Sequence, residues 1–522
     1  MTARQPADIC MILEGTYPYV AGGVSSWVHD VLQTHADRSF HLVCLLPDRQ
    51  ERKPRYTVPG NVVGIEHVYL QDIPTGSRSM PGDHRLFRRM EHGITALMEA
   101  GQLEDLALLD AALAPARRRL GRRRLLNSPA AWQSVLRLYD REMPEGSFLE
   151  FFWSWRSMMS SLFAVLLAEI PPARAYHTIS TGYAGMLAAR AHIETRRPAL
   201  ITEHGIYTNE RRIEITMANW LHEVNAGSLT VQRKKRDLRD LWIDTFTGYS
   251  HCAYSAAWRI ITLYGGNQDL QRRDGAPEER LQVIPNGIDY DRYSAVPRDT
   301  VGQPPTIALI GRVVPIKDVK TYIRAAAMLR QQIPDLQALI LGPFDEDPGY
   351  GQECRDLVAM LGLGETVKFM GQVKLDDWLG RIDAIVLTSI SEAQPLVILE
   401  AGAAGVPTVA TDVGACREMI LGPPDESPAL GAGGAITPLA NPQATATALA
   451  ALLRNPETLA AASRAIQERV RLRYNKRHLD RIYGDLYAEA IALPDAAPVH
   501  LRTPRQRGFF ARWRQQRQPG AT

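Results

Sequence analysis

Short apolar runs alternate with longer helical segments over most of the second half of the chain. This alternation is the sequence form of a parallel β-sheet covered by helices. Several of the apolar runs end in Gly or Ser, at the edge where an open α/β sheet binds its ligands. The predicted strands are residues 306–311, 336–342, 366–371, 384–389 and 407–411.

The first half of the chain follows the same α/β pattern less regularly. Residues from about 80 to 170 are predicted to form a mostly helical insertion. Its most apolar part, residues 148–170, is interrupted by Glu150, Arg156 and Glu169. The uncharged run is shorter than the roughly 20 residues that a spanning helix needs, so we expect a buried helix. The predicted strands are residues 8–13, 40–46, 61–69, 174–179, 199–202 and 281–284.

The 522 residues exceed the roughly 250–300 that one hydrophobic core covers, so two large domains are predicted. The turn residues Pro285-Asn286-Gly287 and the polar segment 296–305 mark the boundary between them. We expect a first domain over residues 1–295, a second over residues 296–472, a helix over residues 473–495 that returns to the first domain, and a basic flexible tail over residues 496–522.

The overall charge and the cysteines exclude several classes of function. The 60 Lys and Arg residues nearly balance the 57 Asp and Glu residues, so nucleic acid is not expected as the main partner. The five cysteines are scattered and form no C-x-x-C pair, which argues against a disulfide framework and a zinc site. We expect no metal and a reducing cytosol. Residues 1–8 are polar, so no secretory leader is expected.

Two segments are strongly basic despite the balanced total. Arg117–Arg119 with Arg122–Arg124 lie inside the predicted insertion. They form either a solvated helix face or a docking patch for an acidic partner or lipid headgroups. Residues 502–517 carry six arginines and no acid, with three aromatic residues between them. This tail is either disordered and solubilising or a short segment that touches anionic lipid.

The strongest chemical signal follows the predicted strand 384–389. A polar loop carries Glu392, and Pro395 stands where a helix begins, a position that tolerates its missing N–H. The free amides of that first helical turn and the positive end of the helix dipole make an anion site. Glu400 lies in the apolar helix that follows, so its carboxylate needs donors such as sugar hydroxyls.

A second signal, Gly311-Arg312-Val313-Val314-Pro315-Ile316-Lys317, follows the first predicted strand of the second domain. Gly311 lets the backbone pass close to a ligand, and two cations so close in sequence can reach one diphosphate. Each charge-assisted hydrogen bond of this kind contributes roughly 1.5–3 kcal/mol. Arg312 and Lys317 together can therefore replace a divalent metal in stabilising a leaving diphosphate.

These motifs resemble glycosyltransferase family 4, whose members have two glutamates eight positions apart and an Arg/Lys pair after the first strand of the second domain. Residues 401–414 and Val283–Asp289 are also similar to that family. The resemblance covers about residues 8–490 and implies a GT-B fold, in which two Rossmann-like domains face each other across a cleft, and retention of anomeric configuration. It also implies that Arg312 and Lys317 bind the donor phosphates, Glu400 the ribose and Glu392 the transferred sugar, with Val373 and Leu396 in the nucleotide site. Where many members have Gly-Phe-Gly, this chain has Ala393-Gln394-Pro395.

The first domain offers weaker signals. Gly22 and Gly23 stand between the first strand and the next helix, and they form either a plain tight turn or a close approach to the donor. His204 ends a predicted strand and is either a structural residue or, by the resemblance, a contact for the donor sugar. The segments Glu14–Val24 and Glu203–Tyr207 resemble cytosolic transferases of Pel exopolysaccharide assembly.

The resulting prediction is a retaining, metal-independent transferase without a cofactor that moves a hexose from a UDP-sugar, UDP-glucose first, to a growing exopolysaccharide. The expected partners are this donor, the polysaccharide acceptor and an inner-membrane synthesis and export complex, with the enzyme cytoplasmic or peripheral at that membrane. No G-x-G-x-x-G or P-loop lysine motif indicates another nucleotide cofactor. The alternatives are a transferase similar to glycogen or sucrose synthase with another nucleotide sugar, and a non-catalytic sugar-nucleotide-binding subunit.

Overall fold

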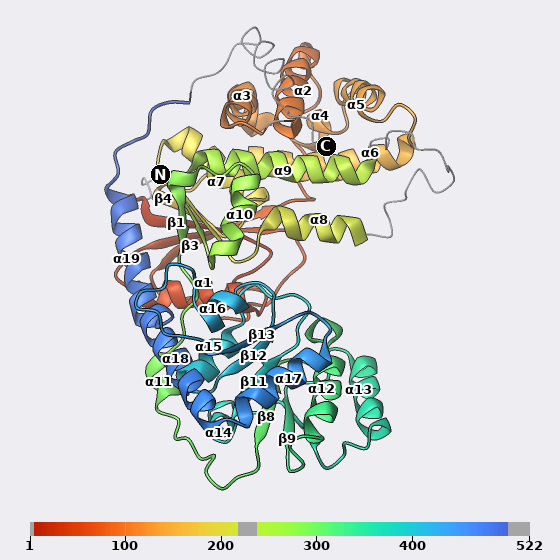
Figure 1. Cartoon of the computed structure of the whole chain (residues 1–522). Helices are drawn as coiled ribbons and strands as arrows, with labels where there is room; N and C mark the ends of the chain where they lie inside the picture. The colour runs from red at the N-terminus through yellow and green to blue at the C-terminus, as the bar shows by residue number, and fades with distance from the viewer. Residues whose placement is uncertain (1–4, 100, 218–236, 500–522) are drawn as a thin grey trace, which may run out of the picture. The chain divides into compact units, whose positions relative to one another are not determined.

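The computed structural model of the chain describes residues 5–99, 101–217 and 237–499 (Figure 1). The arginine-rich segment 502–517 lies outside these described residues. Contacts divide the chain into two compact units, and each is described by itself. Unit 1 comprises the described residues of Met1–Ile261, Asp269–Gln282 and Gly484–Thr522, and unit 2 comprises Thr262–Gln268 and Val283–Tyr483.

A seven-stranded sheet with the order β3-β2-β1-β4-β5-β6-β7 forms the centre of unit 1. The pairings of β1 with β2 and β4, of β2 with β3, and of β4 with β5 are parallel. All seven residues of β2 are buried, whereas β3, at the edge, alternates exposed and covered positions. The strands are β1 (Ala7–Glu14), β2 (Phe40–Leu46), β3 (Val62–Tyr69), β4 (Ala173–Thr178), β5 (Ala199–Glu203), β6 (Ala257–Thr262) and β7 (Leu281–Val283).

Unit 2 repeats this strand order in a six-stranded sheet, β10-β9-β8-β11-β12-β13, in which every pairing is parallel. In both sheets the first strand lies beside the fourth, so the connections leave in opposite directions at that point. This topological switch point is where doubly wound sheets bind ligands. The strands are β8 (Thr306–Ile310), β9 (Gln337–Leu341), β10 (Val367–Gly371), β11 (Ala384–Leu387), β12 (Thr408–Thr411) and β13 (Gly434–Thr437).

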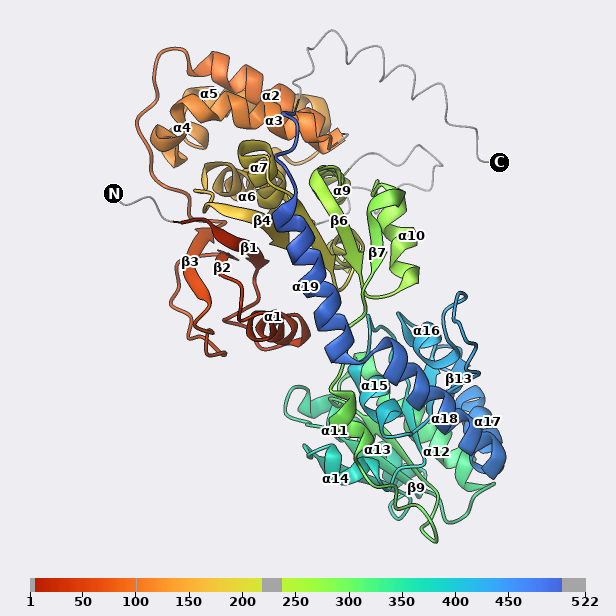
Figure 2. The same cartoon turned by 90° about the vertical axis from the view of Figure 1, so that its left-hand side faces the viewer.

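Helices cover both sheets, as two parallel sheets with largely buried strands require. In unit 1 they are α1 (Gly23–Thr34), α7 (Tyr183–Thr195), α8 (Tyr207–Met217), α9 (Leu238–Ala256) and the short η2 (Glu278–Arg280). In unit 2 they are α11 (Tyr290–Ser294), η3 (Pro315–Lys317), α12 (Val319–Arg330), α13 (Pro348–Met360), α14 (Asp376–Leu379), α15 (Leu396–Ala403), α16 (Cys416–Leu421), α17 (Pro442–Leu453) and α18 (Pro456–Arg473). Two helices, α10 (Gly265–Arg273) and α19 (Lys476–Ala492), contribute residues to both units (Figure 2).

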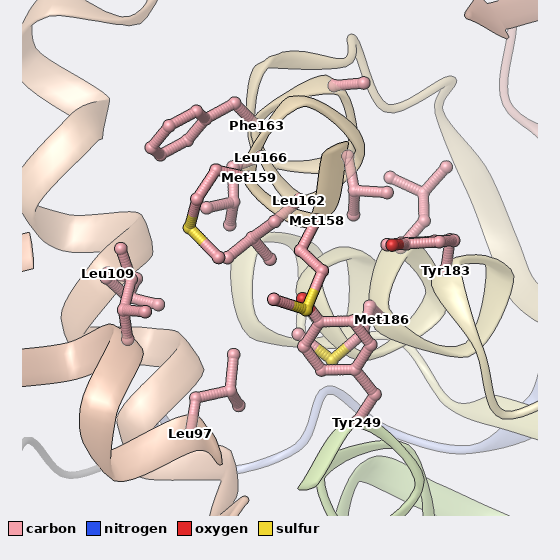
Figure 3. Close-up of a cluster of buried hydrophobic side chains, with 14 of the residues drawn as sticks. Leu97, Leu109, Met158, Met159, Leu162, Phe163, Leu166, Tyr183, Met186 and Tyr249 are labelled. Carbon is pink, nitrogen blue, oxygen red and sulfur yellow. The ribbon is translucent and has the colours of Figure 1, made fainter. Parts of the chain in front are cut away.

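A group of helices between β3 and β4 forms the insertion of unit 1. It consists of α2 (Asp83–Glu99), α3 (Leu103–Leu113), η1 (Ala114–Arg119), α4 (Arg122–Leu125), α5 (Pro129–Glu142) and α6 (Phe148–Leu167). The middle of α6 is buried, and Met158, Met159 and Leu162 lie near Leu97 of α2 and Leu109 of α3 (Figure 3). The predicted buried helix is therefore confirmed. Within the described part of the chain, no helix combines the length and apolar character needed to cross a membrane.

A buried ion network joins this insertion to α7. The Arg190 side chain is 1% exposed, and its Nε donates to Asp110 Oδ1 at 3.1 Å and to Glu194 Oε1 at 2.8 Å. Its Nη1 donates to the carbonyl oxygens of Val165 and Ala168 at 2.6 and 2.8 Å. Arg117 pairs with the same two carboxylates at 2.5 Å. Since both acids are largely covered, their charges depend on these guanidinium groups.

We expect Arg190→Met to lower the free energy of unfolding of unit 1 by about 3–5 kcal/mol, because it leaves two covered carboxylates with one cation. Urea denaturation followed by circular dichroism measures the change. Arg118→Met is the control, because Arg118 is exposed. Its effect should stay within about 0.5 kcal/mol. Equal losses in both variants would contradict a structural role for the network.

Candidate functional site

The candidate site of unit 2 lies at its topological switch point. Gly311, Arg312 and Lys317 follow β8, and Glu392 follows β11, which is hydrogen-bonded to β8 in the sheet. Because both strands are parallel, their following loops leave the same edge of the sheet. The predicted residues from two sequence-distant motifs are thus brought together by strand order.

Backbone contacts hold the two loops against each other. The Ile390 N–H donates to the Ile316 carbonyl oxygen at 2.8 Å, and the Thr388 hydroxyl donates to the Lys317 carbonyl oxygen at 2.9 Å. A Cβ atom added to Gly311 would lie 3.6 Å from Lys317 Cε, so the lysine side chain extends along the glycine. These contacts fix the direction of the Lys317 side chain.

Lys317 and Glu392 form an ion pair in this arrangement. The distance from Lys317 Nζ to Glu392 Oε1 is 2.5 Å, and the side chains are 21% and 14% exposed. The pair is partly covered, so its Coulomb energy is screened less than that of a surface pair. The second cation, Arg312, pairs at 2.5 Å with Glu346, and both of these side chains are 53% exposed. Each predicted phosphate-binding cation therefore has a carboxylate neighbour.

Glu400 lies on α15 with its carboxylate partly buried. The Tyr293 hydroxyl of α11 donates to Glu400 Oε1 at 3.1 Å, and burial raises the pKa of Glu400 above its usual value. The hydrogen bond from Tyr293 and the nearby charge of Arg292 oppose that increase. Tyr293 thus supplies the donor that a covered carboxylate requires, and among the residues that the structure describes no donor reaches the second oxygen of Glu400.

The loop residues Ala393-Gln394-Pro395 have a structural partner within unit 2. The Gln394 side chain accepts a hydrogen bond from the Asn286 N–H at 2.8 Å and donates to the Asn286 carbonyl oxygen at 3.3 Å. A Cβ atom at Gly414 would lie 2.2 Å from the Glu392 carbonyl oxygen, so only glycine fits there. The Glu392 loop is therefore fixed from two sides.

The remaining predicted residues of unit 2 are Pro395, Leu396 and Val373. Pro395 is the N-cap of α15, which begins at Leu396, and the Leu396 side chain is 38% exposed. Val373 follows β10 and packs against the hydrophobic cluster that includes Leu387 and Leu399. Helix α15 begins at Leu396, so its positive end follows directly on the loop that carries Glu392.

The predicted residues of unit 1 lie at the start of α1 and directly after β5. Gly22 and Gly23 are exposed at the start of α1, and an added Cβ atom would meet no atom within 4 Å at either position. Packing within unit 1 therefore does not require glycine there. His204 directly follows β5, and the Trp27 ring of α1 lies edge-on at 4.9 Å from its ring.

The His204 imidazole is covered but makes no hydrogen bond within the described residues. Its side chain is 9% exposed, and neither ring nitrogen has a partner there. Burial lowers the pKa of His204 to about 4, so the ring is neutral at pH 7. A neutral imidazole can donate one hydrogen bond and accept another.

Beside His204, Glu203 is fully buried in a polar network. The Tyr254 hydroxyl and the Gln271 amide donate to its Oε2 at 2.6 and 2.9 Å, and the Tyr207 N–H donates to its Oε1 at 3.4 Å. Burial nevertheless raises the pKa of Glu203 to about 7. The sequence of the strand Ala199–Glu203 does not predict the raised pKa of Glu203, because the groups that donate hydrogen bonds to this carboxylate come from other elements.

Two family models match the chain in separate regions. Residues 7–279 match the model described as Domain of unknown function (DUF3492), and residues 304–455 match the model described as Glycosyl transferases group 1. The second region contains every predicted site residue of unit 2. The match to group 1 glycosyltransferases therefore lies within unit 2.

Curated relatives share part of the chain. The D-inositol 3-phosphate glycosyltransferase 2 of Catenulispora acidiphila is 32% identical over 207 residues, which are 37% of this chain and 47% of that protein. The D-inositol 3-phosphate glycosyltransferase of Thermobispora bispora is 30% identical over 203 residues, which are 36% of this chain and 46% of that protein. The chain spans less than half the length of these relatives.

Solved structures are similar over almost the whole chain. The Anabaena protein HepE in complex with UDP has a TM-score of 0.52 at 14% identity, covering 92% of this chain and 99% of that one. Sucrose-phosphate synthase from Thermosynechococcus elongatus has a TM-score of 0.53 at 17% identity, with the same coverage. At such low identity the likeness concerns the fold, and it confirms the predicted class of two Rossmann-like domains of the GT-B type.

The raised pKa of Glu203 predicts a specific pH dependence of stability. Between its ordinary value of 4.5 and about 7, the folded chain holds a proton that the unfolded chain releases. The corresponding stabilisation is present below pH 4.5 and is lost as the pH rises through 7. Glu203→Gln should remove this dependence, because the amide stays neutral and the Gln271 side chain can turn to accept from it.

From pH 4.5 to pH 8, the free energy of unfolding of the wild type should fall by about 3 kcal/mol relative to that of Glu203→Gln. Urea denaturation at four pH values measures it, and the subtraction removes the contributions of other titrating groups. A difference that is constant with pH would show that Glu203 titrates normally.

Proposed function

The chain belongs to the family described as Domain of unknown function (DUF3492), and on this premise we propose that it is a nucleotide-sugar-dependent glycosyltransferase. The proposed reaction is retaining, metal-independent transfer of a hexose from a UDP-sugar, with UDP-glucose as the first candidate, to a growing exopolysaccharide. The observation that carries the proposal is the ion pair between Lys317 and Glu392, which joins the loops after β8 and β11 at the switch point of unit 2.

The donor diphosphate would bind by replacing the carboxylates that are paired with the two cations. Its phosphate oxygens would take over Lys317 from Glu392 and Arg312 from Glu346, two pairs that the structure holds at 2.5 Å. Glu392 would then be free to accept hydrogen bonds from the hydroxyls of the transferred sugar. Glu400, oriented by Tyr293, would bind the ribose hydroxyls with its remaining lone pairs.

Catalysis would follow from charge stabilisation at the leaving group. Negative charge develops on the departing UDP as the glycosidic bond breaks, and the two cations and the first turn of α15 would oppose it. In a front-face reaction the departing phosphate accepts the proton of the acceptor hydroxyl, so no protein base is needed. His204 of unit 1 is neutral and would contact the donor sugar by hydrogen bonding.

Two observations support the UDP-sugar and the polysaccharide acceptor. HepE has been crystallised with UDP and with UDP-glucose, and its fold is similar to that of this chain. The segments Glu14–Val24 and Glu203–Tyr207 resemble PelF, the cytosolic transferase of Pel exopolysaccharide assembly. The proposed enzyme would act on the cytoplasmic side with an inner-membrane synthesis and export complex.

The likeness to sucrose-phosphate synthase favours one alternative, a transferase that uses a small sugar phosphate as acceptor.

A UDP-release assay distinguishes this alternative from transfer to a polysaccharide. We expect UDP release from UDP-glucose, UDP-N-acetylglucosamine or UDP-N-acetylgalactosamine to increase with polysaccharide acceptor and not with sugar phosphates. Glu400→Ala should reduce the rate at least about 100-fold. A chain that binds UDP but releases none from any UDP-sugar would be a non-catalytic subunit.

Lys317→Ala should lower turnover by about 100-fold or more while weakening UDP binding by less than about tenfold. The reason is that ground-state binding must break the Lys317–Glu392 pair, whereas the leaving group gains the full charge of the lysine. Turnover and isothermal titration with UDP measure the two effects. Lys320→Ala is the matched control, since Lys320 pairs with Glu353 on neighbouring α12 and α13 and should change neither quantity appreciably. Equal losses in turnover and binding would argue against a leaving-group role.

A further inference from the structure

The insertion of unit 1 separates its six clustered arginines into two kinds. Arg117 pairs with Asp110 and Glu194 at 2.5 Å, and Arg124 is buried against Asp83. The other four side chains are exposed and make no ion pair or hydrogen bond within the described residues. They are Arg118, Arg119, Arg122 and Arg123. Two arginines therefore stabilise the insertion, and four are left to face solvent.

The four exposed arginines are held on a fixed piece of backbone. The Ser77 N–H donates to the Arg119 carbonyl oxygen at 2.9 Å, and the Arg122 N–H donates to the Pro74 carbonyl oxygen at 2.8 Å. A Cβ atom at Gly121 would lie 2.2 Å from that same Pro74 oxygen. The two pairs of arginines are therefore presented by a tightly packed turn, which lowers the entropy cost of binding several charges at once.

Large apolar side chains are exposed on the adjoining helices. Trp132 in the first turn of α5 is 45% exposed, and Leu149 and Trp153 on α6 are 64% and 59% exposed. The Trp132 ring packs edge-on against Phe148 and Phe152 at 5.6 and 5.8 Å, so the group is ordered. Exposed clusters of this kind mark surfaces that contact a partner or a membrane.

Hydrogen bonds join the elements that carry the basic and the aromatic groups. Arg156 of α6 donates to the Asn127 side chain at 2.9 Å and to the Leu126 carbonyl oxygen at 3.4 Å. Leu126 and Asn127 connect α4, which carries Arg122 and Arg123, to α5, and Figure 2 shows α4 beside α5. The arginines and aromatic side chains therefore lie on adjacent elements.

We propose that this basic and aromatic surface docks the protein on an anionic lipid bilayer. Its members are Arg118, Arg119, Arg122, Arg123, Trp132, Leu149 and Trp153. Guanidinium groups bind lipid phosphates in bidentate fashion, and tryptophan and leucine enter the layer below the headgroups. An acidic protein surface would match the arginines but leave the apolar group in water, whereas a bilayer offers both chemistries in one plane.

Vesicle sedimentation with the full chain tests this proposal. We expect strong binding to vesicles of phosphatidylcholine and phosphatidylglycerol in a 70:30 ratio at 0.1 M salt and weak binding to pure phosphatidylcholine. Replacing Arg118, Arg119, Arg122 and Arg123 by Gln should reduce the partition coefficient at least about tenfold. Leu149→Ser with Trp153→Ser should reduce it about threefold or more at both 0.1 and 0.5 M salt, because apolar contacts are not screened.

Matched variants in unit 2 control for charge and hydrophobicity. Replacing Arg324, Arg381, Arg454 and Arg464, which are exposed, by Gln makes the same change in charge. Val301→Ser with Met360→Ser, at sites 95% and 75% exposed, makes a comparable loss of apolar surface. Both controls should bind vesicles as wild type does, and residues 500–522 are common to every variant.

Two outcomes would overturn the proposal. One is a wild-type chain that binds anionic vesicles no better than neutral ones, which would favour an acidic protein as the partner. The other is an arginine variant that loses no more binding than its control in unit 2. Thermal unfolding shows whether each variant is folded. UDP release in solution without vesicles should be unchanged in the arginine variant, so failure of the docking proposal is distinguishable from failure of the proposed transferase activity.

Discussion

The candidate site depends on the order of the parallel strands. The first strand of the sheet lies beside the fourth, and both end at the same edge. In unit 2 this order places the loops after β8 and β11 together, and the Ile390–Ile316 backbone hydrogen bond closes them. Lys317 then meets Glu392 although 75 residues separate them in sequence. The charges of the site follow from this geometry, because neither loop alone would hold a cation beside an acid at a helix start.

Much of the fold could be predicted from hydrophobic alternation, and the exceptions have physical reasons. The predicted strands of both halves are present within one or two residues. Two strands were missed, β6 and β13. The former follows α9 without a turn residue, since Ala257 ends the helix and begins the strand, and β13 is four residues long beside Gly433. Helix and strand cannot be separated by pattern at β6, where no Gly, Pro or Asn stands between them, and the four residues of β13 are too few to show a period.

The same contrast applies to the site. Arg312, Lys317, Glu392 and Glu400 stand in compact motifs and could be selected from the sequence. Their partners could not, because Glu346, Tyr293 and Asn286 come from other segments and are ordinary residues in their local sequence. The burial of a single side chain could not be predicted from the local sequence either. The titration of Glu203 near pH 7 arises from a covered position at a strand end and not from any neighbouring sequence letter.

The two groups of cations, Arg312 with Lys317 in unit 2 and the four exposed arginines of the insertion, differ in whether a carboxylate lies beside them. This difference favours different ligands for the two groups. Arg312 and Lys317 each have a carboxylate at 2.5 Å, so an isolated phosphate must displace an acid and gains little net charge. In the proposed complex, the sugar and the ribose of the donor would add further contacts that compensate, which would favour the complete donor over simple phosphates. The four exposed arginines of the insertion have no such neighbours within the described residues, so any dense array of phosphates attracts them. If both proposals hold, the carboxylates of Glu346 and Glu392 would keep the proposed donor site of unit 2 from binding the lipid phosphates that the exposed arginines bind.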